Sequence, residues 1–394
     1  MTNQNNSLSH IFRVNKDIPA MPFIACGAAL LLVGLIGVIR VLVYGQEAVY
    51  GVTRQVPWGL LIATYAYFVI TSTGLAFIGG LGHAFNVQPF ARIGKRIVLL
   101  AFIILLAGFT QIGMEIGHPF RLMYLFILSP NFSAPIVWMG IFYGIELFLL
   151  SIELYLIFVK SPKNHALSAA TAFLTLMVGV AATSNLGFVF GSLTARPFYH
   201  GIYFPTFLVV SGIAGGCAIL LLIHNIIYRF NIPDELSRTM SGLSKLMGLC
   251  IGAMLFLSAW KIISSLYTAP AEAYEAATAL LSGPLAINFW CGEIIFALLL
   301  PLAMLLMSRG KNFMIMGAAG LFFMIGMFFT RYDFIVAGQL HPMRAGNAGS
   351  HVDVLNGLVH YAPSSGEWMI FALGLGLFFF FYFLAERFIA LEPE

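Results

Sequence analysis

Ten long apolar stretches alternate with short polar connections along this chain. Each stretch is about 20 residues or longer, the length that an α-helix needs to cross a bilayer. They cover residues 21–43, 57–80, 97–117, 135–159, 168–191, 204–228, 242–267, 285–307, 312–332 and 367–388. Because a lipid-embedded segment must satisfy its own backbone hydrogen bonds, the pattern predicts an all-α polytopic membrane protein with about ten transmembrane helices.

Composition and the first residues support this prediction. Hydrophobic residues make up 60% of the 394 positions and charged residues 9%, whereas soluble globular proteins have roughly 45–50% and about 25%. The first twenty residues are polar, and the first apolar stretch is too long for the core of a cleaved signal peptide. We therefore expect the first helix itself to direct insertion.

The distribution of positive charge predicts the orientation. Thirteen of the 20 Lys and Arg residues fall on the side that carries both chain ends, and seven fall on the other. The positive-inside rule then predicts that both termini are cytoplasmic. The formal net charge of +4 is explained by anchoring at the inner membrane face, and no nucleic-acid partner is expected.

The spacing of potential metal ligands predicts no metal site, haem or iron–sulfur cluster in this chain. The four cysteines lie inside predicted helices without CxxC spacing, so neither a disulfide framework nor a cluster site is expected. A haem held between helices needs His residues on two facing helices, and only His224 lies within a predicted span. Neither a P-loop nor an HExxH motif is present.

Carboxylates inside the apolar stretches are the clearest candidates for chemistry. Glu146 and Glu153 lie in the fourth predicted helix and Glu293 in the eighth; an ionisable residue at mid-bilayer costs on the order of 2.5–3.5 kcal/mol. Glu146 and Glu153 are seven positions apart, so they share one helix face about 10 Å apart. They are candidates for a proton path, and the alternative is that each joins helices through hydrogen bonds.

A polar cluster ends the third predicted helix on the outer side. Gln111, Glu115 and His118 share one face, and Arg121 follows. Hydrogen-bonding groups at the mouth of an apolar cavity suit a lipophilic quinone head group, and Glu or His could accept the protons of a quinol. The alternative is that His118 and Arg121 are interfacial anchors, paired with Glu115 or with lipid phosphate.

Two further polar groups are predicted on the outer face. One combines Arg331 and Asp333 with Gln339 and His341, and the other is Arg196 with Tyr199 and His200. Three such groups above an apolar bundle indicate a site or a docking surface on that face.

The predicted second and sixth helices resemble each other. Both begin beside a Pro and carry small residues midway, TSTG at 71–74 and SGIAGG at 211–216. Small residues permit close helix packing in lipid. The resemblance fits a duplication of four helices, the second to fifth against the sixth to ninth.

Several stretches, which keep their order from about residue 20 to the end, resemble the NrfD/PsrC family of membrane subunits of respiratory complexes. The stretches are VPWGLLIATYAYFVITSTGLAF from Val56, EIGHPFRLMYLFILSPNFSAPIVW from Glu115, GSLTARPFYH from Gly191, INFWCGEIIFALLLPL from Ile287, RYDFIVAGQLHP from Arg331 and YAPSSGEWMI from Tyr361. Glu115 and His118 stand where the family usually has Asp and Arg, and Tyr199 replaces a Trp. The ten-helix length resembles the subgroup with the membrane subunits of quinone-linked hydrogenase, the Dsr complex and alternative complex three.

The resemblance implies a fold of two four-helix bundles plus two flanking helices, in the bacterial inner membrane. It also implies that the protein binds no cofactor of its own, and that a quinone pocket lies near the periplasmic face beneath a ferredoxin-like iron–sulfur subunit. Further catalytic or haem subunits and membrane lipid are the other expected partners. This places the expected pocket beside Glu115 and His118.

We therefore expect a quinone-reactive subunit of a respiratory oxidoreductase, with menaquinone or ubiquinone as substrate. Glu115 and His118 are the expected catalytic residues, and the expected quinone-binding residues are Trp58, Gln111, Glu115, His118, Arg121 and Tyr143. Electrons would pass to or from the iron–sulfur subunit, and Glu146, Glu153 and Glu293 would form a proton path. The alternative interpretations are an ion-coupled secondary transporter with interrupted helices, or a passive membrane anchor for a redox enzyme.

The expected organisation follows from these assignments. It comprises a cytoplasmic tail at 1–20, the first helix and outer loop at 21–56, a first bundle with the quinone site at 57–191, a second bundle at 192–332, an outer lid at 333–366, and the last helix and cytoplasmic tail at 367–394. The lid segment is too apolar for a disordered linker.

Overall fold

The computed structural model describes residues 15, 18–117, 124, 128–158, 165–267, 270–342, 354–355 and 358–391. The helices are α1 (Ala20–Tyr44), α2 (Gln46–Val49), α3 (Leu60–His83), α4 (Gln88–Ala91), α5 (Gly94–Glu115), α6 (Pro135–Phe158), α7 (His165–Gly191), α8 (Tyr203–Ile227), α9 (Asp234–Tyr267), α10 (Ala271–Leu281), the π-helix η4 (Asn288–Leu299), α11 (Leu300–Ser308), α12 (Phe313–Ala337) and α13 (Ser365–Phe388). The two strands, β1 (Val354–Leu355) and β2 (Leu358–Val359), form an antiparallel pair.

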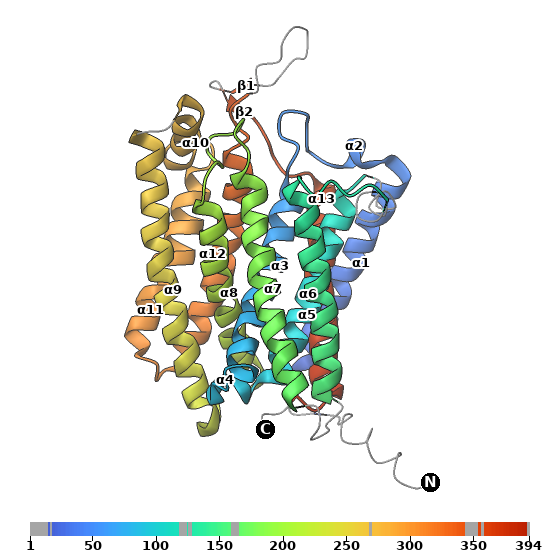
Figure 1. The fold of residues 1–394 in the computed structure, drawn as a ribbon, viewed down its shortest axis with the longest axis vertical. Helices are drawn as coiled ribbons and strands as arrows, with labels where there is room; N and C mark the ends of the chain where they lie inside the picture. Colours follow the sequence, from blue (N-terminus) through green and yellow to red (C-terminus); the bar gives the residue numbers. More distant parts are fainter. Residues whose placement is uncertain are drawn as a thin grey trace.

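Within these described residues, ten helical segments are long and apolar enough to cross a membrane. Nine are single helices, and η4 with α11 forms the tenth as a continuous segment, Asn288–Ser308. The predicted all-α polytopic fold is confirmed. The long helices run side by side, with α2, α10 and the β-strands at one end and α4 at the other (Figure 1). We call these the β-hairpin end and the α4 end.

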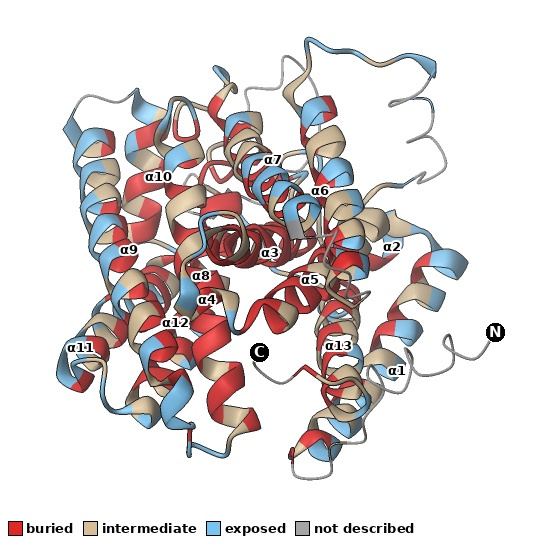
Figure 2. Ribbon diagram, turned by 60° about the horizontal axis from the view of Figure 1, so that its bottom comes forward, coloured by how far each residue is buried: buried red, intermediate tan, exposed pale blue. Residues whose placement is uncertain are grey.

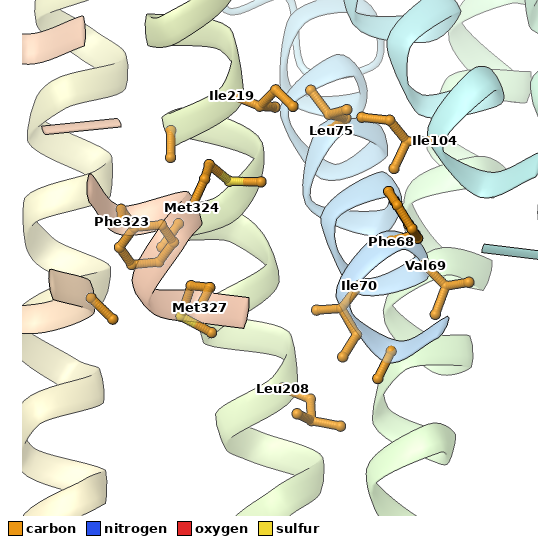
Figure 3. Packing of buried hydrophobic residues seen from close by; sticks show 14 of the residues in the cluster. Phe68, Val69, Ile70, Leu75, Ile104, Leu208, Ile219, Phe323, Met324 and Met327 are labelled. Carbon is orange, nitrogen blue, oxygen red and sulfur yellow. The ribbon is translucent and has the colours of Figure 1, made fainter. Parts of the chain in front are cut away.

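Helix α3 is at the centre of the molecule. It packs against α5, α7, α8, α12 and α13, and 83% of its most apolar window is buried. Figure 2 shows α3 in the buried colour along its length, whereas α1 and α9 present exposed residues to the outside. The apolar side chains around α3, including Phe68, Ile104 and Ile219, form a continuous core with α5, α8 and α12 (Figure 3).

Neighbouring helices form two closed groups around this centre. Helices α3, α5, α6 and α7 contact one another in sequence, and α8, α9, η4 with α11, and α12 do the same. Helices α1 and α13 pack together along their length, and α13 also packs against α5. The division into two four-helix bundles with two flanking helices remains a prediction that suits these contacts.

The two small-residue segments of the predicted repeat contact each other. A Cβ atom added to Gly74 on α3 would lie 1.8 Å from the Gly212 carbonyl oxygen on α8, and one added to Gly216 would lie 2.5 Å from the Gly74 carbonyl carbon. Both distances are shorter than any non-bonded contact, so the two backbones touch directly. The close packing expected for small residues in lipid therefore occurs between the two segments.

Several helix boundaries differ from the sequence prediction. Helix α9 begins at Asp234, eight positions before the predicted start, because Asp234 and Glu235 in its first turn are polar residues that suit a helix N-terminus. Helix α12 continues to Ala337, so the start of the predicted lid is helical. Of the rest of the lid, residues 343–353 and 356–357 lie outside the described residues.

We predict that Gly216→Ala lowers the stability of the protein whereas Gly215→Ala does not. The new methyl group at 216 would overlap the α3 backbone, but the nearest atom to a Cβ at 215 is Thr71 Oγ1 at 3.5 Å, an ordinary contact. Overpacking of this kind costs typically about 1–3 kcal/mol. Thermal unfolding in detergent measures the difference, and equal melting temperatures for the two variants would contradict the close contact.

Candidate functional site

Gln111 and Glu115 lie on α5 near the β-hairpin end. The Gln111 side chain is fully buried; its oxygen accepts from Thr64 Oγ1 at 3.0 Å and its nitrogen donates to the Ile370 carbonyl at 3.0 Å. Gln111 therefore joins α5 to α3 and α13. Glu115, one turn further on, ends α5, and its Oε2 atom is buried with no hydrogen-bond partner among the described residues.

Two other side chains surround Glu115. Burial raises the pKa of the Tyr50 phenol well above its ordinary value, and the carboxylates of Glu115 and Glu367 raise it further. Tyr50 therefore stays neutral and donates to the Met114 carbonyl at 2.9 Å. Glu115 thus shares its surroundings with a phenol and a second carboxylate, and this makes its unpaired oxygen costly.

Glu367 joins the chain segments at this end, which the sequence analysis did not predict. Its carboxylate accepts from the backbone amides of Gly51 at 2.9 Å, Leu60 at 3.3 Å and Ser364 at 2.8 Å, and from the Tyr361 hydroxyl at 2.5 Å. Glu367 and Ser364 also form a capping box at the start of α13. The pair stands three positions apart in SSGE, and this spacing is the sequence signal that identifies a capping box.

Tyr143 and Trp58 lie in other surroundings. Tyr143 is fully buried; its hydroxyl lies 3.3 Å from Thr183 Oγ1 and its ring contacts Tyr65. The Trp58 ring packs edge-on against Phe190 of α7. Tyr143 therefore belongs to the interior of α3, α6 and α7, and Trp58 to the end of α7.

The structure thus brings together only part of the predicted quinone-binding set. Gln111 and Glu115 both lie next to α13, but among the described residues no hydrogen bond or ring contact joins either of them to Tyr143 or Trp58. His118 and Arg121 lie outside the described residues.

The two carboxylates of α6 face α3, as their spacing predicts. Glu146 is fully buried and accepts from Thr73 Oγ1 at 3.3 and 3.4 Å. Glu153 is 2% exposed and pairs with His83 Nδ1 at 3.2 Å. His83 ends α3 at the α4 end and is partly exposed, so it links the buried Glu153 to that surface.

Glu293 belongs to a second polar group, in η4, α8, α9 and α12. Its Oε1 atom accepts from Ser258 Oγ at 3.1 Å, and Arg331 donates to Ser211 Oγ at 2.6 Å. Arg331 and Asp333 are 3% and 1% exposed, so neither lies on the outer face where the sequence analysis placed them. They are buried because α12 continues beyond both residues.

A small cavity opens beside this group. It has a volume of about 40 Å³, room for about one water molecule. Its polar lining is Tyr203, Ser258, Lys261, Glu293 and Asp333. Neither Asp333 oxygen makes a hydrogen bond of ordinary geometry, although the Asn288 side chain lies beside it. A hydrated cavity here would connect two carboxylates that otherwise have few partners.

The remaining predicted polar residues join loops at the β-hairpin end. Arg196 donates to the carbonyls of Gly338 at 3.3 Å, His341 at 3.0 Å and Gln55 at 3.2 Å. Gln339 exchanges hydrogen bonds with the Trp58 backbone at 3.1 and 2.9 Å. These contacts support the surface structurally, and His200 is the exposed member of the set.

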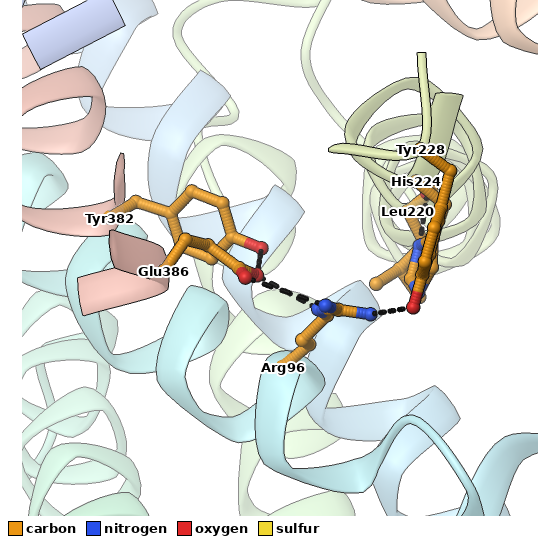
Figure 4. Close-up of polar contacts among 6 residues, drawn as sticks. All are labelled: Arg96, Leu220, His224, Tyr228, Tyr382 and Glu386. Atoms are coloured by element: carbon orange, nitrogen blue, oxygen red, sulfur yellow. Dashed lines mark hydrogen bonds and ion pairs between the residues drawn. The ribbon is translucent and has the colours of Figure 1, made fainter. Parts of the chain in front are cut away.

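A buried ion pair near the α4 end was also missed by the sequence analysis. Arg96 Nε lies 2.8 Å from Glu386 Oε1, Arg96 donates to the Tyr228 hydroxyl at 3.0 Å, and Tyr382 donates to Glu386 at 2.5 Å (Figure 4). The pair joins α5 to α13, and Tyr228 follows the end of α8. Arg96 looked like a loop residue because the predicted helix began at Ile97.

Comparison with known proteins agrees with this architecture. Residues 48–343 match the family described as Polysulphide reductase, NrfD. The chain belongs to the NrfD family. The resemblance inferred from the sequence motifs is therefore confirmed.

Three relatives carry names that describe parts of reductase or oxidoreductase complexes. A selenate reductase subunit of Mesobacillus selenatarsenatis is 24% identical over 382 residues, 85% of this chain and 87% of the relative. The "Hdr-like menaquinol oxidoreductase integral membrane subunit" of Archaeoglobus fulgidus is 23% identical over 354 residues, 87% of each chain. The "Putative dimethyl sulfoxide reductase membrane subunit" of Halobacterium salinarum is 25% identical over 225 residues, 50% of each chain.

We predict that the Arg96–Glu386 contact of this NrfD-family chain is strongly coupled. Arg96→Met or Glu386→Leu alone leaves one buried charge without its partner and should cost about 3–5 kcal/mol, whereas the double variant should recover most of the loss. Thermal unfolding of the wild type and three variants completes the double-mutant cycle. Additive losses would show that the two side chains act independently.

Proposed function

We propose that this chain is the quinone-reactive membrane subunit of a multi-subunit respiratory oxidoreductase. It passes electrons between the membrane quinone pool and an iron–sulfur partner subunit. Membership of the NrfD family and the similarity to a menaquinol oxidoreductase membrane subunit support this assignment, and menaquinone or ubiquinone is the substrate class.

The unpaired oxygen of Glu115 carries the proposal. A buried polar atom without a partner is rare in proteins and marks a position where a ligand or water completes the hydrogen bonding. Glu115 ends α5 beside the Tyr50 phenol and the Glu367 carboxylate. A quinol hydroxyl donating to Glu115 Oε2 would supply the missing hydrogen bond.

The chemistry needs a proton acceptor at this position. Oxidation of a quinol releases two protons together with two electrons, and a positioned carboxylate accepts a proton in the same way as any general base. We assign this role to Glu115, with His118 as the second acceptor and Arg121 beside it. Gln111 holds Glu115 in place indirectly, because its amide fixes α5 against α3 and α13.

Tyr143 and Trp58 have positioning roles in this proposal. Tyr143 packs inside the helices that carry Glu146, and Trp58 supports the end of α7. Both shape the walls of the first bundle at its β-hairpin end.

Electrons must leave through a partner. We propose a ferredoxin-like iron–sulfur subunit on the periplasmic face at the β-hairpin end, with the termini in the cytoplasm and the chain in a bacterial inner membrane. The thirteen basic residues on the terminal side support this orientation. Glu115 lies at the β-hairpin end, which would keep the quinone head near the docked partner.

Glu146, Glu153 and Glu293 would carry protons across the membrane. The pair of His83 with Glu153 at 3.2 Å supports an opening at the α4 end, and Glu146 lies about 10 Å further inward along α6. The π-helical geometry around Glu293 supports a functional role for this residue too, because such segments are frequent at functional sites.

We predict that Glu115→Gln reduces quinol-dependent turnover of the complex by about 10²-fold, because the amide cannot accept a proton. His118→Ala should have the same direction of effect. Reduction by an artificial donor that delivers electrons directly to the partner subunits should be unchanged. Activity is measured in membranes containing the whole complex.

The matched control for this test is Glu47→Gln, which removes an exposed carboxylate at the same end of the molecule. It should retain full activity with both donors. Full quinol-dependent turnover in Glu115→Gln would overturn the assignment and favour a passive membrane anchor.

We predict that Glu146→Gln and Glu153→Gln each lower the number of protons translocated per electron, because a neutral amide interrupts proton transfer between carboxylates. The ratio is measured with the complex in sealed vesicles. Glu235→Gln, at an exposed position in the first turn of α9, is the control. An unchanged ratio in both buried variants would end the idea of a proton path through α6.

A further inference from the structure

A second ligand-sized space lies away from Glu115, between α12 and α13. Its volume is about 370 Å³, within the range of small-molecule sites. We call it the α12–α13 chamber. Residues of α3, α5, α8, α12 and α13 line it: Tyr67, Phe68, Thr71, Ile104, Ile219, Leu222, Leu321, Met324, Ile325, Phe328, Phe329, Phe371, Leu375, Phe378 and Phe379.

The packing of the helices explains why the chamber exists. Helix α13 packs against α1 and α5, whereas α12 packs against α8 and η4, and both also contact α3. The two helices therefore diverge over the surface of α3. Leu321 and Ile325 on the rim are 43% and 40% exposed, so the chamber opens sideways, toward the region that lipid occupies.

Aromatic rings close the chamber toward the β-hairpin end. Phe328 stacks on Phe371 with ring centroids 5.3 Å apart, and Trp368 lies 5.8 Å from Phe328. A ligand would therefore enter from the lipid side rather than from the aqueous face. Such an entrance suits a molecule that is dissolved in the membrane.

One unpaired polar group faces this apolar space. The Tyr67 hydroxyl has no hydrogen-bond partner among the described residues, and Arg331 lies within electrostatic range of it. Thr71 Oγ1 donates to the Tyr67 carbonyl at 2.7 Å, which leaves the Thr71 oxygen free to accept. The chamber thus offers one donor to a carbonyl and one acceptor to a hydroxyl.

We propose that the α12–α13 chamber binds an isoprenoid quinone or quinol, with its ring oxygen at Tyr67 and Thr71 and its prenyl chain along the phenylalanine-lined wall toward the lipid. The inference rests on the proposed function and assigns a second, separate position for the same substrate class. It assigns binding alone to this position.

Depth and chemistry favour a quinone over a phospholipid. Tyr67 is seven residues into α3, about 10 Å below its start at 1.5 Å per residue, and a charged phospholipid head cannot be buried there cheaply. An acyl chain would leave the Tyr67 hydroxyl without a partner. A quinone ring is neutral and brings carbonyl oxygens that accept this hydrogen bond.

The chamber also lies next to the residues of the proposed reaction site. A Cβ atom at Gly374 of α13 would contact both the Gln111 amide nitrogen at 2.6 Å and the Phe68 ring at 2.8 Å. Phe68 lines the chamber, and Gln111 lies one helical turn from Glu115. The chamber is therefore placed to hold quinone close to the position where it reacts.

Photolabelling of the solubilised complex with an azido-substituted quinone carrying a prenyl chain tests the proposal. We expect label on α12 between Leu321 and Phe329. Ile325→Trp fills the chamber from its rim and should reduce this label about tenfold or more. Tyr67→Phe keeps the shape, removes one hydrogen bond and should reduce it about fivefold.

Ile295→Trp is the matched control, because Ile295 is 44% exposed on η4 and does not line the chamber. It should leave the label unchanged. Label on α12 that persists in Ile325→Trp would overturn the proposal. So would loss of co-purifying phospholipid in Ile325→Trp with unchanged quinone label, since the chamber would then hold an acyl chain.

The same experiment separates this inference from the proposed function. Quinol-dependent turnover together with label confined to residues near Glu115 would overturn the chamber and leave the function standing. Absence of both turnover and label in the wild-type complex would overturn both.

Discussion

The direct backbone contact between α3 and α8 sets the distance between the two halves of the molecule. Gly74 and Gly216 meet so closely that no side chain fits between them, and in lipid such packing replaces the hydrophobic effect as the force that joins helices. With one face of α3 held against α8, its other faces carry the polar residues. Thr64 meets Gln111 and Thr73 meets Glu146, so the positions of both groups depend on this contact.

Most buried charges found here have partners, and the exceptions are informative. Arg96 and Glu386 satisfy each other, as expected of a group that is expensive to bury. Glu115 and Asp333 instead keep buried oxygens without ordinary hydrogen bonds. Paired groups join helices, whereas unpaired ones store a binding potential that a substrate or water can satisfy, and this contrast separates structural from functional polar residues in this fold.

The two proposed quinone positions lie on the two sides of a single side-chain layer. Phe68 lines the α12–α13 chamber, and Gln111 lies behind it beside Gly374. A hydrophobic substrate could thus move from lipid to the proposed reaction site without crossing the aqueous face. The closed aromatic contact of Phe328 with Phe371 keeps the chamber separate from that face, where a partner protein would dock.

The sequence by itself determined the membrane class and the number of spans, because apolar stretches of about 20 residues have no stable alternative in lipid. It also determined that Glu146 and Glu153 share a face, since helical periodicity is local. Only the tertiary structure decided which partners these groups have and where the spaces lie. Glu367 binds the amide of Gly51, 316 positions away, and the chamber combines five helices. Helix packing creates such contacts, and no local pattern records them.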